Sequence, residues 1–328
     1  MRRRRRTFAL AAVAAILGSL YLLNASWLAR PDGRLTILAH RGVHHTFPPQ
    51  GVGDATCTAT RITPPTHEFI ENTLPSIRRA FELGADVVEI DVHPTTDGEF
   101  AVFHDWTLDC RTNGAGVTRK HSLAQLKALD VGYGYTADGG STFPLRGKGV
   151  GMMPSLAETL AAFPGRRFMI NVKSNDATEG DRLAAYLAAR APAAIPNLVV
   201  FGGPKPVERI RAIEPRLRAF GKQDFKACAT GYLAWGWAGH VPGACRGIMV
   251  FVPQKQAWMA WGWPNRFLRR MQDAGAEVYI AGDAQFRGRQ SLHGLDDPAR
   301  LKDLPRGWKG GISTDRVELI APALRPIP

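Results

Sequence analysis

Two carboxylates and a histidine stand close together on a predicted β-hairpin in the first third of the chain. Glu89 and Asp91 alternate along the first β run, so their side chains share one face. Asp97-Gly98 separates this run from the next, and an Asp-Gly pair between β runs is typical of a two-residue hairpin turn. Pairing outward from that turn sets His104 opposite Asp91. We therefore expect Glu89, Asp91 and His104 to converge on one patch.

The chemistry of such a patch follows from its residue types. Two neighbouring carboxylates repel each other unless a cation or a shared proton lies between them. Oxygen ligands suit a hard divalent cation, Ca²⁺ or Mg²⁺. A histidine beside the cation is suited to proton transfer. The hairpin alone also fits an ordinary solvated strand face that ends in a surface turn, and on its own it favours that reading.

Further motifs upstream and downstream change this balance, because together they have the order and spacing of one known family. They are His40-Arg41-Gly42, Glu71-Asn72-Thr73, Gly84-Ala85-Asp86, Asp97-Gly98, His104-Asp105, Met153-Pro154-Ser155-Leu156 and Gly311-Ile312-Ser313-Thr314-Asp315. From about residue 35 to residue 319 the chain resembles the glycerophosphodiester phosphodiesterase family. The resemblance implies a TIM-type barrel, one divalent metal ion and two catalytic histidines.

The resemblance also implies a role for each matched residue. His40 and His104 correspond to the general acid–base pair, and Glu89 and Asp91 correspond to metal ligands. Arg41 would hold a phosphate oxygen, for which the guanidinium fork is well shaped. The implied activity is hydrolysis of glycerophosphodiesters to glycerol 3-phosphate and an alcohol.

Two features depart from the family pattern. Asn171 stands where the family usually has a third carboxylate, although its amide oxygen can still bind Ca²⁺ or Mg²⁺ and Lys173 remains available to the phosphate. The site then has one negative charge fewer, which bears on metal affinity and metal choice. The second departure is a long insert, residues 44–70, which we interpret as a lid over the barrel mouth. A solvated excursion is the alternative.

Two other functions remain open. An apolar N-terminus and a cluster of tryptophans suggest a phospholipase that acts on intact membrane lipid. Asn171 suggests a non-catalytic relative that binds phosphate without turnover.

For Glu71 we expect either a place behind the metal ligands or a capping role at the following helix, where Asn72 or Thr73 is the candidate cap.

Strand and helix patterns alternate along the chain, which predicts an α/β fold. With the resemblance, the expected architecture is a TIM-type (β/α)8 barrel with a small β-hairpin insertion, preceded by one N-terminal membrane helix. Expected strands after the hairpin cover 167–172, 198–201, 217–220, 247–252, 278–281 and 311–314. Expected helices cover 74–83, 122–129, 155–163, 179–191, 206–213 and 265–274.

The N-terminus has the pattern of a signal anchor. Residues 1–6 form a basic segment that should stay cytoplasmic, and residues 7–29 are uncharged and long enough to span a bilayer. Trp27 and Leu28 crowd the place of a cleavage site, so we expect an uncleaved anchor rather than a removed signal peptide. Residues 30–328 would then form a single barrel domain on the exported side of the cell membrane.

The overall charge fits an anionic substrate. The formal net charge is +13, and five of the positive charges lie in residues 2–6. A basic body suits a glycerophosphodiester or phospholipid-derived substrate or an anionic lipid surface, but an excess of basic residues is often only solubilising. Nucleic acid is not an expected partner, because the chain has no zinc spacing and no aromatic-basic repeat.

Cysteines and tryptophans give two further expectations. Four cysteines allow three pairings, and for an exported protein we expect Cys57–Cys110 and Cys228–Cys245, with free buried thiols as the alternative. Five of the eight tryptophans lie between residues 228 and 263. These rings could contact a lipid interface, stack on a headgroup or pack a loop.

Overall fold

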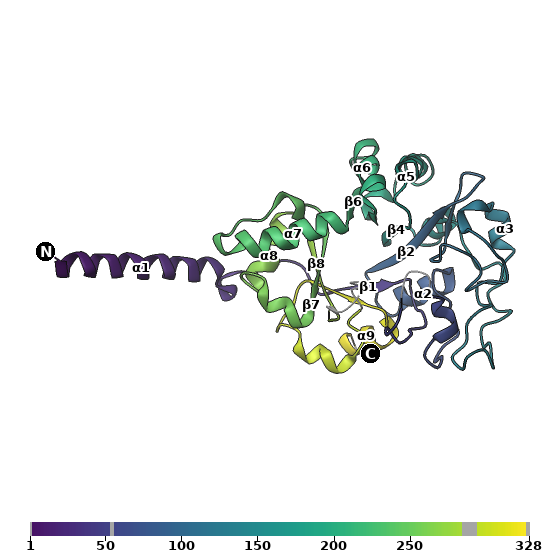
Figure 1. The fold of residues 1–328 in the computed structure, drawn as a ribbon, viewed down its shortest axis with the longest axis horizontal. Helices are drawn as coiled ribbons and strands as arrows, with labels where there is room; N and C mark the ends of the chain where they lie inside the picture. Colours follow the sequence, from purple (N-terminus) through teal and green to yellow (C-terminus); the bar gives the residue numbers. More distant parts are fainter. Residues whose placement is uncertain (1, 53–55, 284–293, 326–328) are drawn as a thin grey trace.

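The structure is a computed structural model that describes residues 2–52, 56–283 and 294–325. Eight parallel strands form a nearly closed barrel with helices on its outside, as Figure 1 shows, and the predicted TIM-type architecture is confirmed. The strand order is β6-β5-β4-β2-β1-β9-β8-β7, and β3 pairs only with β2. The strands are β1 Thr36–His40, β2 Val87–Pro94, β3 Phe100–Val102, β4 Arg167–Val172, β5 Leu198–Gly202, β6 Arg218–Gly221, β7 Met249–Pro253, β8 Glu277–Ala281 and β9 Gly311–Thr314.

The α-helices are α1 Arg2–Asn24, α2 Leu74–Glu82, α3 Leu123–Lys127, α4 Leu156–Ala162, α5 Ala177–Arg190, α6 Pro204–Ile213, α7 Lys222–Trp235, α8 Asn265–Asp273 and α9 Val317–Leu324. The sequence patterns indicate most of them, but they miss α7 and α9. In α7 only Cys228 and Tyr232 are buried, so this helix lacks a strong 3.6-residue apolar period. In α9 a proline at position 322 lies inside the helix and obscures it.

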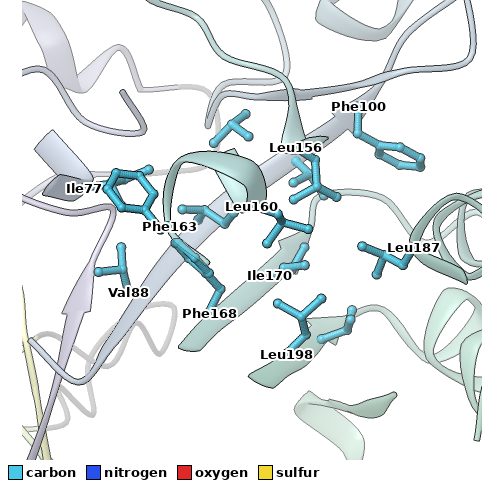
Figure 2. Packing of buried hydrophobic residues seen from close by; sticks show 14 of the residues in the cluster. Ile77, Val88, Phe100, Leu156, Leu160, Phe163, Phe168, Ile170, Leu187 and Leu198 are labelled. Atoms are coloured by element: carbon cyan, nitrogen blue, oxygen red, sulfur yellow. The ribbon is translucent and has the colours of Figure 1, made fainter. Parts of the chain in front are cut away.

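Burial on both faces of β2 places two carboxylates inside the barrel. Every residue of β2 is buried. Val88, Ile90 and Val92 pack in the layer between the sheet and the outer helices, and Figure 2 shows Val88 with residues of α2 and α4 in this layer. Because side chains alternate along a strand, Glu89 and Asp91 point to the other face, into the barrel.

The hairpin after β2 differs from the predicted one by a single residue in register. Val92 pairs with Val102, and Pro94 pairs with Phe100, so the loop has three residues, 96–98, instead of two. The Thr95 N–H donates to the Glu99 carbonyl at 2.9 Å, and Gly98 takes a left-handed φ of 86°. Three-residue loops closed by a left-handed glycine are a common hairpin type. As a result Asp91 faces Phe103, and His104 lies beyond the end of β3.

Both predicted disulfides are confirmed. Cys57–Cys110 joins the insert to the loop that follows His104, across 53 residues of chain. Cys228–Cys245 joins α7 to the segment before β7, across 17 residues. The first crosslink therefore holds the predicted lid against the loop that carries a candidate catalytic residue.

Helix α1 projects from the barrel next to α7 and α8 (Figure 1). Among the described residues it is the one helix long and apolar enough to cross a membrane: residues 7–24 have a mean hydropathy of 1.8, and none of them is buried. Length and composition of this kind are shared by membrane anchors and signal sequences. The helix ends at Asn24, and the chain then turns so that Ala25 and Ala29 are buried.

Candidate active site

Five of the predicted site residues come together at the C-terminal ends of three neighbouring strands. His40 ends β1 and is in register with Glu89 on β2. Asp91 on β2 is in turn in register with Asn171 on β4, and Lys173 follows that strand. This end of the barrel is where TIM-barrel enzymes carry their active sites.

Two segments beside the site, one directly after β1 and one directly before α2, have an unusual backbone conformation. Arg41 and Asn72 both have positive φ, 56° and 59°, although neither is a glycine. The Asn72 side-chain N–H₂ donates to Asp91 Oδ2 at 3.0 Å, and the Asp91 backbone N–H donates to Asn72 Oδ1 at 3.1 Å. Gly42 also has positive φ, 79°, and a Cβ there would lie 2.4 Å from Ser76 Oγ. Strained backbone of this kind is typical of functional sites.

His40 is fixed by a carboxylate from the closing strand. Its Nδ1 lies 2.6 Å from Asp315 Oδ1, just after β9, and its Nε2 lies 3.8 Å from Glu89 Oε2. Burial and Arg41 oppose a positive charge on the ring, but Asp315 and Glu89 outweigh them and raise the pKa of His40.

His104 has a matching arrangement with a different electrostatic result. Its Nδ1 lies 2.6 Å from Asp105 Oδ1, and the other oxygen of Asp105 lies 2.9 Å from Arg111 Nε. Burial, together with the positive charge of Arg41, lowers the pKa of His104 to about 4. The two histidines therefore differ in their affinity for a proton.

Asp105 and Asp315 are functional candidates to which the sequence analysis assigned no role. Each occupies the Nδ1 side of one histidine, which leaves Nε2 as the ring nitrogen available to a substrate. Both residues are nevertheless visible in the quoted motifs: one follows His104 directly, and the other ends the last strand. The role of Asp315 was missed because it depends on the pairing of β1 with β9. That pairing sets Ala39 opposite Thr314 and so brings the next residues, His40 and Asp315, side by side.

Glu71 bridges two buried arginines under the site. Its two oxygens lie 3.0 Å from Arg41 Nη1 and 3.1 Å from Arg111 Nη1. Arg111 also donates to Thr58 Oγ1 in the insert at 2.7 Å. Thr73, one of the two expected caps, occupies the N-cap position of α2, but its hydroxyl donates to the Ile70 carbonyl and makes no capping hydrogen bond. The Asn72 amide binds Asp91 instead of capping the helix.

Glu71 gives the fold an acid-sensitive component. Burial opposes its ionisation, but Arg111 and Arg41 lower its pKa from 4.5 to about 2. A carboxylate with a lowered folded-state pKa stabilises the protein above its unfolded pKa, and this stabilisation is lost as the pH falls from about 4.5 to about 2. We expect Glu71→Gln to cost on the order of 3 kcal/mol of unfolding free energy at pH 7 and much less at pH 3.

Urea unfolding at several pH values measures this difference. The matched control is Glu208→Gln, since Glu208 is an exposed glutamate on α6. Equal losses for Glu71→Gln at pH 7 and at pH 3 would contradict the electrostatic explanation.

The carboxylates of β2 have opposite surroundings. Asp91 lies next to four donors: its Oδ1 is 3.0 Å from Asn171 Nδ2 and 3.2 Å from Lys173 Nζ, and its Oδ2 is near Asn72 and Arg41. Lys173 and the other nearby cations hold the pKa of Asp91 well below its ordinary value despite burial. Glu89 Oε2 is buried and has no hydrogen-bond partner among the residues that the structure describes. Burial and the charge of Asp91 raise the pKa of Glu89.

These oxygens fit a hard divalent cation with one condition. Glu89 has a free oxygen, and the Asn171 amide points its nitrogen to Asp91, which leaves its carbonyl oxygen available. A carboxylate has about four lone-pair sites, and Asn72, Asn171 and Lys173 donate to three of them. The positively charged Arg41 Nε lies 3.3 Å from Asp91 Oδ2 as an ion-pair partner. A cation at Asp91 therefore requires Arg41, Lys173 or Asn171 to give up its contact.

His40, His44 and Asp315 form a second group whose potential ligand atoms lie within 4.8 Å of one another. The 2.6 Å distance between His40 Nδ1 and Asp315 Oδ1 is that of a charge-assisted hydrogen bond. An ion placed in this group would have to break that bond. We therefore interpret the group as the support of His40.

Comparison with known proteins agrees with the geometry. The model of the glycerophosphoryl diester phosphodiesterase family matches residues 40–189. A glycerophosphodiester phosphodiesterase of Caldanaerobacter subterraneus is 37% identical over 103 residues, 31% of this chain and 39% of the relative. One of Bacillus subtilis is 32% identical over 166 residues, 49% of this chain and 47% of the relative. The chain thus spans less than half the length of these curated relatives.

A solved structure extends the comparison to the whole barrel. The crystal structure of a glycerophosphodiester phosphodiesterase from Agrobacterium tumefaciens aligns with 88% of this chain and 99% of its own, with a TM-score of 0.55 and 22% sequence identity. This similarity concerns the fold. The family match over residues 40–189 contains both histidines and both carboxylates of β2, so this part of the chain is similar to the glycerophosphoryl diester phosphodiesterase family at the residues of the candidate site.

Proposed function

We propose that this protein is a phosphoric diester hydrolase that converts glycerophosphodiesters into glycerol 3-phosphate and an alcohol. The observation that carries the proposal is a pair of histidines, His40 and His104, each with an aspartate on Nδ1. Glu71 lies between Arg41, the residue after His40, and Arg111. Arg111 in turn contacts Asp105, the partner of His104, and this chain of ion pairs supports one shared site. Two imidazoles that leave Nε2 available at one site suit a reaction that needs both a base and an acid.

The proposed mechanism uses a hydroxyl of the substrate itself. One histidine accepts the proton of the glycerol hydroxyl next to the phosphate, and that oxygen attacks phosphorus. The other histidine donates a proton to the leaving alcohol. Water then opens the resulting cyclic phosphate, and the two histidines exchange roles. Arg41 and Lys173 contribute positive charge that favours a phosphate at this end of the barrel.

A divalent ion, Ca²⁺ or Mg²⁺, would be held by Glu89 and Asn171, and by Asp91 once a present donor is displaced. When bound, it would polarise the phosphate and lower the pKa of the attacking hydroxyl. Asp91 otherwise keeps Lys173 and Arg41 in place through the contacts described above.

A turnover screen tests the proposal directly. The substrates are glycerophosphodiesters with choline, ethanolamine, glycerol and inositol headgroups, each with Ca²⁺, with Mg²⁺ and with chelator. We expect release of glycerol 3-phosphate that depends on the cation. Intact phospholipids belong in the same screen, because α1 supports the alternative of a phospholipase. Binding of metal and ligand without turnover of any diester would instead favour the non-catalytic alternative suggested by Asn171.

Asn171→Glu should increase the affinity for the metal ion and lower the stability of the metal-free protein. The new carboxylate would replace an amide donor 3.0 Å from Asp91 with a negative charge, which repels Asp91 when no cation is present. With Ca²⁺ the added charge attracts the ion, and we expect its affinity to rise about 10-fold or more.

Calorimetric titration gives this affinity, and thermal unfolding with and without Ca²⁺ gives the stability. In chelator the variant should have a lower melting temperature than the wild type. Addition of Ca²⁺ should raise the melting temperature of the variant more than that of the wild type. Asn197→Glu, at the other end of the barrel before β5, is the control. An unchanged affinity would remove Asn171 from the metal site.

We also propose that α1 anchors the protein in the cell membrane as a single-pass helix, with the barrel on the exported side. The support is the exposed apolar window at residues 7–24, the basic residues before it and the two disulfides of the barrel. Resistance of the full chain to carbonate extraction from membranes tests this anchor. Release into the soluble fraction would contradict it.

A further inference from the structure

An apolar cleft of about 550 Å³ lies where α1 meets the barrel. Four aromatic side chains line it, Tyr21 and Trp27 from the N-terminal segment and Trp237 and Trp261 from the barrel. Their exposed fractions are 66%, 68%, 38% and 42%. Large apolar side chains gathered around one cleft and left this exposed indicate an interaction surface.

The position of this aromatic cleft along α1 matches one depth in a bilayer. The apolar window covers 18 residues, which corresponds to about 27 Å of helix and so nearly fills a hydrocarbon core of about 30 Å. Trp27 lies three residues after the end of that window. Tryptophan and tyrosine are enriched at this level, because their rings combine an apolar body with a polar N–H or O–H group.

The barrel is fixed to the end of α1 and does not hang from a loose linker. The nearly buried Arg270 of α8 donates to the Leu23 carbonyl at 3.0 Å and lies 3.1 Å from Asn24 Oδ1. The same guanidinium donates to the Gly236 carbonyl at 2.9 Å. Carbonyls at a helix C-terminus have no partner within the helix, so a cation there both satisfies them and opposes the helix dipole.

A second contact joins the same parts from the other side. The Asn24 side-chain N–H₂ donates to the Trp237 carbonyl at 2.7 Å. The Asn265 backbone N–H donates to Ser26 Oγ at 2.9 Å. These contacts therefore fix the direction in which α1 leaves the barrel. They also fix which side of the barrel would face a membrane that α1 crosses.

We propose that this cleft is a membrane-docking surface, in which a phospholipid of the leaflet next to the barrel lies against the four aromatic rings. The proposal rests on α1 being a membrane anchor, as proposed above. It commits to lipid because the cleft is continuous with the apolar helix. In this arrangement the side of the barrel formed by α7 and α8 rests on the bilayer. Figure 1 shows these two helices beside α1 and far from α3.

Paramagnetic lipid tests the docking in the full chain. The protein is produced with 5-fluorotryptophan, reconstituted in phosphatidylcholine nanodiscs, and its fluorine signals are assigned by single Trp→Phe replacements. A spin label near the lipid headgroup should remove the signals of Trp27, Trp237 and Trp261. Trp106 is the matched control: it is 47% exposed but lies in the loop after β3, with its ring against Arg119 and His93.

Two measurements separate failure of the docking from failure of the anchor. Carbonate-resistant protein whose Trp237 and Trp261 signals persist beside the spin label would overturn the docking and leave the anchor in place. Protein that carbonate extracts would overturn both. If these signals are lost only in nanodiscs that hold a dimer and persist in nanodiscs that hold one copy, the cleft binds a second copy of the chain. That result would overturn the proposal that a lipid occupies it.

Arg270→Gln tests the rigid connection. The variant removes the bonds from Arg270 to Leu23 and Asn24 and keeps α1 intact, while the contacts of Asn24 with Trp237 and of Ser26 with Asn265 remain. We therefore expect Trp27 to stay broadened while Trp237 and Trp261 regain part of their signals. The fluorine signal of the buried Trp308 reports whether the barrel is folded. A correctly folded variant with all three signals still lost would show that Arg270 does not hold the cleft on the membrane.

Discussion

Replacement of either histidine should abolish most turnover. We expect His40→Ala and His104→Ala each to lower kcat by about 10²- to 10⁴-fold, since each removes a proton-transfer group from the site. Steady-state hydrolysis of a glycerophosphodiester measures the loss. His240→Ala is the control, because His240 is exposed and lies before β7, away from the mouth. Full activity of both site variants would remove the histidines from the mechanism.

The leaving group can tell the two histidines apart. An alcohol such as choline needs a proton as it leaves, whereas p-nitrophenolate leaves without one. The variant that lacks the acid should therefore lose much less activity with a p-nitrophenyl diester than with glycerophosphocholine. The variant that lacks the base should lose activity equally with both. Equal losses in both variants with both substrates would contradict a division of labour between acid and base.

The barrel could be predicted because its signals are local and repeated. Strand runs such as 167–172 and 198–201 are short and apolar, and helix patterns separate them, so the order of elements follows from the sequence. The hairpin shows where such reasoning stops. Asp97-Gly98 marks a turn, but the contact between Thr95 and Glu99 adds one residue to the loop, and a shift of one residue changes which side chains face each other.

The support of the site was harder to predict, because its parts come from irregular segments. Arg111 reaches Glu71 and Asp105 from a loop that Cys57–Cys110 ties to the insert. No periodicity relates positions 71, 105 and 111. The contact between Asp315 and His40 is different in kind: closure of the barrel pairs β9 with β1, so this neighbour follows from the fold once the strand order is accepted.

The two aspartates on Nδ1 should matter almost as much as the histidines they hold. Asp105→Asn would place an amide opposite His104 Nδ1. If the amide nitrogen donates there, the proton moves to Nε2, and His104 loses its ability to accept one. Asp315→Asn would have the same effect on His40 and would also remove a charge that raises the pKa of that ring. We expect losses of about 10²-fold or more in kcat from each.

The pH profile distinguishes positioning from a general loss of structure. Without Asp315 the pKa of His40 falls, because burial and Arg41 then act with less opposition, so the limb of the kcat profile that reports His40 should move to lower pH. Asp315→Glu keeps the charge and should recover part of the rate. Asp296→Asn is a neighbouring control, since its carboxylate accepts from the Asp315 backbone N–H and does not touch His40. An Asp315→Asn enzyme with a lower rate but an unmoved profile would show that Asp315 supports the backbone and does not tune the histidine.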